Sequence, residues 1–180
     1  MATVIESPGV VMVAEEALLR GRLADAYRRY GPDAVRLAYL MTGDRALAED
    51  LAHEAFARMA ARLAYLRDPD ATWPYLRRSV ANLVKNHFRH RAVERAYLAA
   101  EGPRVLTAQV DADTVTHEAM RRALLGLPAR QRAALVLRYY EDLPEAEIAA
   151  ILGCRPGTAR SLISRGAQAL RSSTEVIEHA

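Results

Sequence analysis

Apolar residues recur every three or four positions along almost the whole chain, which is the spacing of helices that bury one face. Sustained alternation of apolar and polar residues, the pattern of half-buried strands, does not occur. The pattern therefore predicts an all-α protein. The expected helices cover 12–30, 33–42, 46–64, 72–95, 115–126, 128–141, 145–152 and 156–171.

Glycine and proline set the boundaries of these expected helices. Gly31-Pro32 separates the first two, Gly43 ends the second, and Asp68-Pro69-Asp70 forms a turn before the fourth. The periodicity fades over 99–114, which reads as a linker. We therefore expect two small helical domains joined by a flexible linker. The expected parts are an N-terminal extension (1–20), a first domain (21–95), the linker (96–114), a second domain (115–172) and a tail that frays (173–180).

Composition narrows the class of protein. The chain has 180 residues, 51% apolar and 26% charged, the balance of a soluble globular protein. Its longest apolar runs are about five residues, whereas a membrane span needs roughly 20. The first basic residue, Arg20, follows the apolar run at 10–14, the reverse of a secretory signal. With one cysteine, Cys154, neither an intrachain disulfide nor a cysteine zinc cage can form, and we expect a cytoplasmic protein.

Positive charge is concentrated in two segments. Residues 77–95 carry six cations against one acid, a net charge of +5, and residues 155–171 carry four arginines and no acid, a net charge of +4. The whole chain is only +3, so the remainder is at −6. Two basic segments on an acidic body indicate two contact points for a polyanion, or, alternatively, two solvated helix faces.

The last two expected helices have the layout of a helix-turn-helix motif, with the second as the reading helix. Gly153 suits the left-handed end of the first helix, and Pro156 opens the second. One side of the second helix is small or apolar: Ala159, Leu162, Ile163, Gly166, Ala169 and Leu170. The other side is polar or cationic without a carboxylate, as a DNA major groove requires: Thr158, Arg160, Ser161, Ser164, Arg165, Gln168 and Arg171.

Longer motifs resemble the bacterial sigma-70 family, specifically its extracytoplasmic-function (ECF) group and the actinobacterial SigE-like set within it. Residues 127–171, "LPARQRAALVLRYYEDLPEAEIAAILGCRPGTARSLISRGAQALR", are similar to region 4 of that family. Residues 40–59, "LMTGDRALAEDLAHEAFARM", and 75–91, "YLRRSVANLVKNHFRHR", are similar to region 2. The resemblance implies a sigma factor that binds core RNA polymerase and directs promoter-specific initiation.

The resemblance also assigns roles to residues. Those implied to bind the clamp helices of the largest polymerase subunit are Asp50, Leu51, His53, Glu54 and Phe56. Those implied to melt and hold the −10 element are Tyr75, Arg77, Arg78, Asn82, Lys85, Asn86, His87, Arg89 and Arg91, with Trp73 a further candidate for base stacking. Those implied to bind the −35 element are Arg155, Pro156, Gly157, Thr158, Arg160, Ser161, Ser164 and Arg165.

This sequence departs from the family pattern at several positions. His53 stands where relatives usually carry Gln, and Leu162 replaces a frequent Arg. Arg155 and Pro144 replace helix-capping residues, each cap being worth about 1 kcal/mol. Gly166 in mid-helix costs about 1 kcal/mol relative to Ala.

Implied partners are core RNA polymerase, through its clamp helices and flap region, and promoter DNA, with no membrane. Many relatives are held inactive by an anti-sigma factor, which makes such a factor a candidate partner. We expect no enzymatic activity and no cofactor. We also expect no metal site, because only His87 and His90 are spaced to share a metal ion, and such sites need three or four ligands. Two alternatives remain: a helix-turn-helix regulator that binds DNA on its own, and a helical adaptor that binds protein through residues 48–56.

Overall fold

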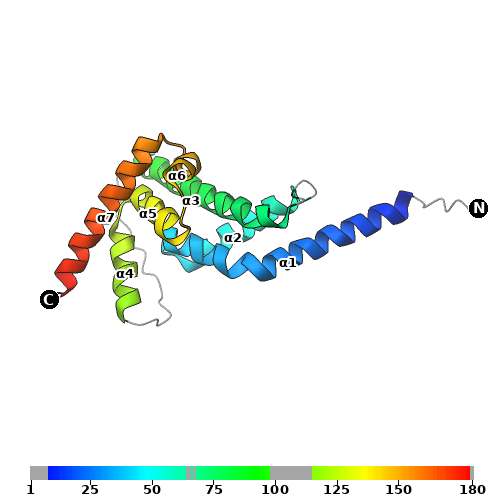
Figure 1. The fold of residues 1–180 in the computed structure, drawn as a ribbon, viewed down its shortest axis with the longest axis horizontal. Coiled ribbons are helices and arrows are strands. Elements are labelled where there is room, and N and C mark those ends of the chain that lie inside the picture. Colours follow the sequence, from blue (N-terminus) through cyan, green and yellow to red (C-terminus); the bar gives the residue numbers. More distant parts are fainter. Residues whose placement is uncertain (1–7, 64–65, 67, 98–114, 179–180) are drawn as a thin grey trace, which may run out of the picture.

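The structure, a computed structural model, describes residues 8–63, 66, 68–97 and 115–178. Figure 1 shows the arrangement of its helices. In chain order they are α1 (Pro8–Thr42), α2 (Arg45–Ala60), the 3-10 turn η1 (Pro69–Ala71), α3 (Thr72–Tyr97), α4 (Val115–Gly126), α5 (Ala129–Leu135), the π-helical turn η2 (Val136–Tyr140), α6 (Glu145–Leu152) and α7 (Pro156–Glu178). The described part of the chain contains no strand, and the expected all-α class is confirmed.

Helices α1, α2 and α3 pack against one another and form what we call the N-terminal unit. Their apolar stripes meet in a core in which each side chain is at most 1% exposed: Leu37 and Met41 from α1, Met59 from α2, Leu76 and Val80 from α3. The buried residues of α2 and α3 therefore recur every three or four positions, as expected of helices that bury one face.

Helix α1 departs from the prediction, because residues expected to form two helices form one. Pro32 lies inside it, although proline lacks the N–H that would bond to the carbonyl four residues earlier. Immediately after it, Ala34, Leu37 and Ala38 are completely buried against the rest of the unit. Their packing outweighs the loss of one hydrogen bond, so the helix continues. Its N-terminal part extends away from the other helices (Figure 1).

The corner between α1 and α2 follows the sequence signals. Gly43 adopts a left-handed φ of 75°, and its N–H donates to the Tyr39 carbonyl over 2.7 Å, which ends α1 as expected. Asp44 then caps α2 by accepting from the Leu47 N–H at 3.1 Å. A side chain at position 43 would collide with Leu125 of α4, so this corner also requires glycine for space.

Helices α4 to α7 form the C-terminal unit, whose core includes the fully buried Leu137 and Ile148. The helix expected over 128–141 consists of α5 followed by η2, with Pro128 at the N-cap. Helix α6 has the expected bounds. Helix α7 continues to Glu178, beyond the expected end at Arg171, so the helix includes most of the tail that was expected to fray.

The two units also pack against each other, through α3 and α6 and through α1 with α4 and α5. Arg132 of α5 lies at this boundary, only 6% exposed. Its Nε donates to the Met41 carbonyl over 2.7 Å, its Nη1 donates to the Leu125 carbonyl over 3.0 Å, and its guanidinium lies 5.7 Å from the Phe88 ring centre. Residues 98–114 of the expected linker lie outside the described part of the chain.

Candidate nucleic-acid interface

The turn between α6 and α7 has the geometry of a helix-turn-helix motif. Gly153 has φ 63° and ψ 49°, the left-handed conformation expected of it, and the next N–H, that of Cys154, donates to the Ala149 carbonyl over 2.9 Å. The first turn of α7 is held by the Arg155 carbonyl, which accepts from the N–H groups of Thr158 and Ala159. The turn thus fixes the direction in which α7 leaves α6.

All eight residues predicted to bind the −35 element are exposed, and they lie together on the first half of α7 or directly before it. On the opposite side, Ala159 and Leu162 are 0% and 8% exposed. The division of α7 into a buried and an exposed face is therefore confirmed. Contact of the exposed face with DNA stays a prediction.

Gly166 has a packing role that the sequence did not reveal. It is buried where α7 crosses α5, and an added Cβ would lie 3.0 Å from Cδ1 and 3.1 Å from Cγ of Leu135. Such spacing is tight for carbon atoms, so the glycine allows close approach of the two helices. The mid-helix glycine is thus explained by contact between α5 and α7.

Replacing glycine by alanine within a helix usually raises the free energy of unfolding by about 0.5–1 kcal/mol. We expect no such gain from Gly166→Ala, because the added methyl group displaces Leu135. The matched control is Gly21→Ala in α1, where nothing lies within 4 Å and the usual gain should appear. Urea unfolding of the full chain measures both. Equal stabilisation by the two substitutions would contradict the packing role.

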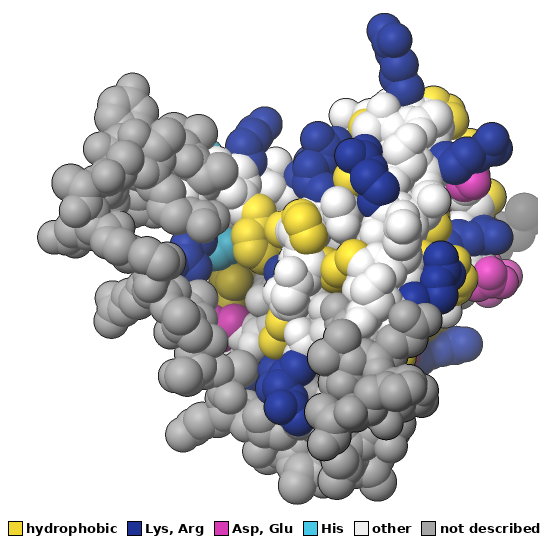
Figure 2. Space-filling model, turned by 90° about the vertical axis from the view of Figure 1, so that its left-hand side faces the viewer, with side chains coloured by type: hydrophobic (Ala, Val, Ile, Leu, Met, Phe, Trp, Pro, Cys, Tyr) yellow, Lys and Arg dark blue, Asp and Glu magenta, His cyan; other side chains and the backbone are white. Residues whose placement is uncertain are grey.

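Arginine side chains dominate the surface around α7. Figure 2 looks onto the end of the molecule where α7 lies and shows many Lys and Arg side chains and few acidic ones among the described residues. Arg160 donates through Nε to the carboxylate of Glu145 on α6, at 3.0 and 3.2 Å. Arg165 donates through Nε to the Ser161 carbonyl over 3.2 Å. Both side chains remain solvent-exposed, as a groove-reading surface requires.

Helix α3 carries all nine residues predicted to bind the −10 element, but they differ in exposure. Arg78 and Arg89 are exposed. The others are partly buried: Tyr75, Arg77, Asn82, Lys85, Asn86, His87 and Arg91. Much of this predicted DNA-binding face is therefore covered in the structure.

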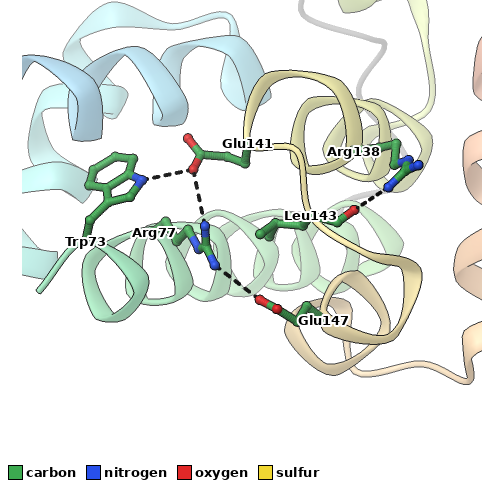
Figure 3. Close-up of polar contacts among 6 residues, drawn as sticks. All are labelled: Trp73, Arg77, Arg138, Glu141, Leu143 and Glu147. Carbon is green, nitrogen blue, oxygen red and sulfur yellow. Dashed lines mark hydrogen bonds and ion pairs between the residues drawn. The ribbon is translucent and has the colours of Figure 1, made fainter. Parts of the chain in front are cut away.

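Arg77 is covered by two carboxylates of the C-terminal unit (Figure 3). Its side chain is 17% exposed, with Nη2 3.1 Å from a Glu147 oxygen and Nη1 3.9 Å from a Glu141 oxygen. Glu141 also accepts from the indole N–H of Trp73 over 3.1 Å, and the Trp73 ring stacks on Tyr30. Sequence reasoning missed both glutamates, which follow Arg77 by 64 and 70 positions and carry no local signal.

Burial of Glu141 affects its ionisation. Its side chain is 5% exposed, and this burial raises the pKa of its carboxyl group, while the hydrogen bond from Trp73 and the charge of Arg77 act in the opposite direction. The two partners thus offset part of the cost of burying this carboxylate.

Lys85, the only lysine of the chain, is also held by the C-terminal unit. Its Nζ donates to the Ile151 carbonyl near the end of α6 and to Asn82 Oδ1, both over 3.0 Å. Burial, followed by repulsion from Arg89 and other arginines, lowers the pKa of its ammonium group. A second predicted DNA-binding cation is therefore engaged within the chain.

His87 is a partly buried member of the same helix. Burial, and then the charge of Arg91, lowers the pKa of its imidazole, which favours the neutral ring. Its Nε2 is buried without a hydrogen-bond partner in the structure, and the ring meets Phe88 edge-on. Among the described residues, no group of three His, Cys, Asp or Glu side chains could hold a metal ion.

The surface predicted to bind polymerase is smaller than the sequence suggested. Asp50, His53 and Glu54 are exposed on α2. Leu51 and Phe56 are 7% and 4% exposed and belong to the core, because their positions fall on the buried stripe of α2. Their assignment as surface contacts is corrected: they support this face from within.

Tyr27 of α1 completes this face and was missed by sequence reasoning. Its hydroxyl lies 2.8 Å from Nε2 of His53, and the two rings are stacked, 7° from parallel and 5.9 Å apart. Tyr27 precedes His53 by 26 positions, so only the packing of α1 on α2 brings the two together. Glu54 pairs with Arg58 over 2.6 Å on the same helix.

An apolar groove of about 440 Å³ lies on the C-terminal unit. Its lining includes Met120 of α4, Leu135 of α5, Tyr139 of η2 and Leu170 of α7, together with Leu40 of α1. Tyr139 is 70% exposed, high for a large aromatic side chain. This groove could not be predicted from the sequence, because its residues come together only through the packing of several helices.

No helix in the described part of the chain combines the length and the apolar character needed to cross a lipid bilayer.

Comparison with known proteins identifies two matching families. Residues 26–93 match "Sigma-70 region 2", and residues 117–170 match "Sigma-70, region 4". The first match covers most of the N-terminal unit, including α2 and most of α3. The second covers most of the C-terminal unit, including the helix-turn-helix motif.

Individual relatives agree with these matches. The chain is 34% identical over 150 residues to the ECF RNA polymerase sigma factor SigE of Mycolicibacterium smegmatis, which covers 80% of this chain and 58% of the relative. It is 33% identical over 164 residues to the ECF RNA polymerase sigma factor SigW of Bacillus subtilis, covering 82% of this chain and 86% of that one. The chain thus spans little more than half the length of the first relative and most of the second.

A solved structure shares the fold. The sigma factor RpoE of Bartonella quintana, in a co-crystal with the anti-sigma factor NepR, superposes with a TM-score of 0.63 over 85% of this chain and 96% of its own, at 20% identity.

Proposed function

The chain belongs to the sigma-70 family, in its ECF group, and from that premise we propose that it binds core RNA polymerase and directs it to specific promoters. The observation that carries the proposal is the exposed face of α7, which bears arginines and hydroxyl groups and no carboxylate, and which a helix-turn-helix motif presents to solvent. Chemistry belongs to the polymerase in this proposal, and the chain supplies recognition.

Recognition of the −35 element is assigned to α7. Arg160 and Arg165 are exposed on the first half of α7, and their terminal guanidinium N–H groups can donate pairs of hydrogen bonds to guanine or to phosphate oxygens. At the N-terminal end of α7, the backbone N–H of Gly157 can donate to a phosphate, whereas Pro156 has no N–H and that of Thr158 already donates to the Arg155 carbonyl. Phosphate contacts set the register, and the arginines read the sequence.

Recognition of the −10 element is assigned to α3. Its cations can hold the phosphates of a single strand, and its amide and aromatic side chains can contact unstacked bases. Arg78 and Arg89 are accessible in the free chain, whereas Arg77 and Lys85 contact the C-terminal unit.

Binding to polymerase is assigned to two surfaces. The exposed side of α2, with Asp50, His53 and Glu54, offers two carboxylates and an imidazole to the clamp helices. The apolar groove beside Tyr139 and Met120 offers a docking surface for the flap region.

The test is promoter-directed transcription in vitro. Core polymerase from Mycolicibacterium smegmatis receives genomic DNA fragments with and without the chain, and start sites are mapped. We expect discrete starts that appear only with the chain. Absence of starts combined with tight, autonomous DNA binding would favour the conventional regulator, and absence of both would favour the adaptor.

Replacement of the exposed acids of α2 should weaken the complex with polymerase. We expect Asp50→Asn/Glu54→Gln to lower the affinity for core enzyme by about tenfold at low salt, because each of two charge pairs at the rim of an interface contributes about 0.5–1 kcal/mol. The loss should shrink as salt is raised. Fluorescence anisotropy of the labelled chain against core polymerase measures it.

The matched control for this prediction is Asp68→Asn/Asp70→Asn, which removes the same charge from the turn that precedes α3. Both residues are exposed and lie outside α2, Asp68 directly before η1 and Asp70 within it. An equal loss of affinity in both double variants would show an effect of net charge alone and would contradict the assignment of the α2 face.

A further inference from the structure

The two predicted DNA-binding surfaces differ in accessibility within the free chain. The residues assigned to the −35 element are all exposed on α7 or just before it. On α3, Arg77 is 17% exposed between two carboxylates, and Lys85 donates to the carbonyl of Ile151. The partners of both cations lie in the C-terminal unit, so one domain of the chain covers part of the DNA-binding face of the other.

The groups of the C-terminal unit that cover α3 are oxygen acceptors, like those of a nucleic-acid backbone. Glu141 and Glu147 present anionic oxygens to the Arg77 guanidinium, as phosphates would, and the end of α6 presents a carbonyl oxygen to Lys85. Glu141 also holds the indole N–H of Trp73, an aromatic at the start of the same helix (Figure 3). These oxygens and a DNA backbone would compete for the same donors.

We propose that the arrangement seen here, with the two units in contact, is a closed state in which Glu141 and Glu147 block the −10 face of α3 while the −35 face of α7 stays open. The inference rests on the proposed function and adds an order of events to it. The closed chain can contact duplex DNA through α7, and it holds a single strand on α3 only after the carboxylates have left Arg77.

Competition of this kind has a defined consequence for affinity. When only a fraction of molecules is open, the apparent affinity for a ligand of the open state falls by that fraction. Removing the two carboxylate charges should raise the open fraction and with it the affinity for single-stranded DNA. Contacts made by α7 should be unaffected.

The experiment compares the free full-length chain with Glu141→Gln/Glu147→Gln. Anisotropy measures binding of a fluorescent oligo-dT strand. Double electron–electron resonance measures the distance between two spin labels. One label is on Cys154 in the C-terminal unit, and the other is on an Ala57→Cys substitution in the N-terminal unit. We expect about tenfold tighter binding of the strand and a broader distance distribution in the Gln variant.

The control is Asp142→Asn/Glu49→Gln, which makes the same change in net charge at an exposed residue beside Glu141 and at one on α2. It should leave the distance distribution as in the wild type and raise strand affinity by much less. Circular dichroism of both variants checks that the helices are intact.

Equal strand affinity in the Gln variant and the control would overturn the proposal, as would an unchanged distance distribution. A broader distribution without tighter strand binding would also overturn it, because the opened face would not be the strand-binding face. All these readouts use the chain without polymerase, so a failure here is separate from failure of the transcription test.

Discussion

Replacing Arg160 and Arg165 by alanine should lower promoter-specific transcription by on the order of 100-fold or more and abolish discrete start sites. Both side chains are exposed on the outer face of α7, and neither contributes to the core of the C-terminal unit. A well-formed arginine contact to a base is worth about 1–3 kcal/mol, so losing two removes most of the discrimination. Run-off transcription from a mapped promoter measures the effect.

Two further variants separate geometry from charge. Arg160→Lys/Arg165→Lys keeps both charges and should retain non-specific DNA affinity while losing much of the sequence discrimination, because lysine lacks the paired donors of a guanidinium. Arg29→Ala/Arg62→Ala removes two exposed arginines of the N-terminal unit and should leave transcription near the wild-type level. Wild-type start sites in the alanine variant of α7 would refute the assignment of the −35 face.

Replacing Arg132 by methionine should lower the free energy of unfolding by about 2–4 kcal/mol. The methionine fills similar volume, but the carbonyls of Met41 and Leu125 lose their charged donor at the boundary between the two units. A buried polar group left without its partner costs about 1–3 kcal/mol, and two are affected here. Removing the buried charge recovers only part of this cost.

The neighbouring Arg130 provides the matched control for Arg132. It lies on α5 two positions away and is exposed, so Arg130→Met should change stability by about 0.5 kcal/mol or less. Urea unfolding followed by circular dichroism compares the two variants. Identical unfolding midpoints for Arg132→Met and the wild type would show that the contact between the units adds nothing to stability.

Local signals predicted the helix-turn-helix motif almost to the residue. Gly153 takes the left-handed conformation that its position at a helix end predicts, and α7 begins at Pro156. Such features depend on residues within a few positions of one another. The alternation of buried and exposed residues on α7 is equally local, since it depends only on helical geometry.

Features that depend on packing at a distance were not predictable from the sequence. Gly31-Pro32 is a reasonable stop signal, yet burial of Leu37 and its neighbours carries α1 through it. The pairing of Trp73 with Glu141 joins residues 68 positions apart. Without knowledge that α3 packs against the C-terminal unit, neither Glu141 nor Glu147 differs from an ordinary surface acid.

The division of α7 into a buried face and an exposed face affects which of its residues can change during evolution. Ala159, Leu162 and Gly166 hold the helix to its unit, whereas the residues that face solvent contribute little to folding. Substitutions on the outer face can therefore accumulate without loss of structure. Under the role proposed for α7, duplicated copies of the gene can therefore acquire different promoter preferences while keeping the same fold.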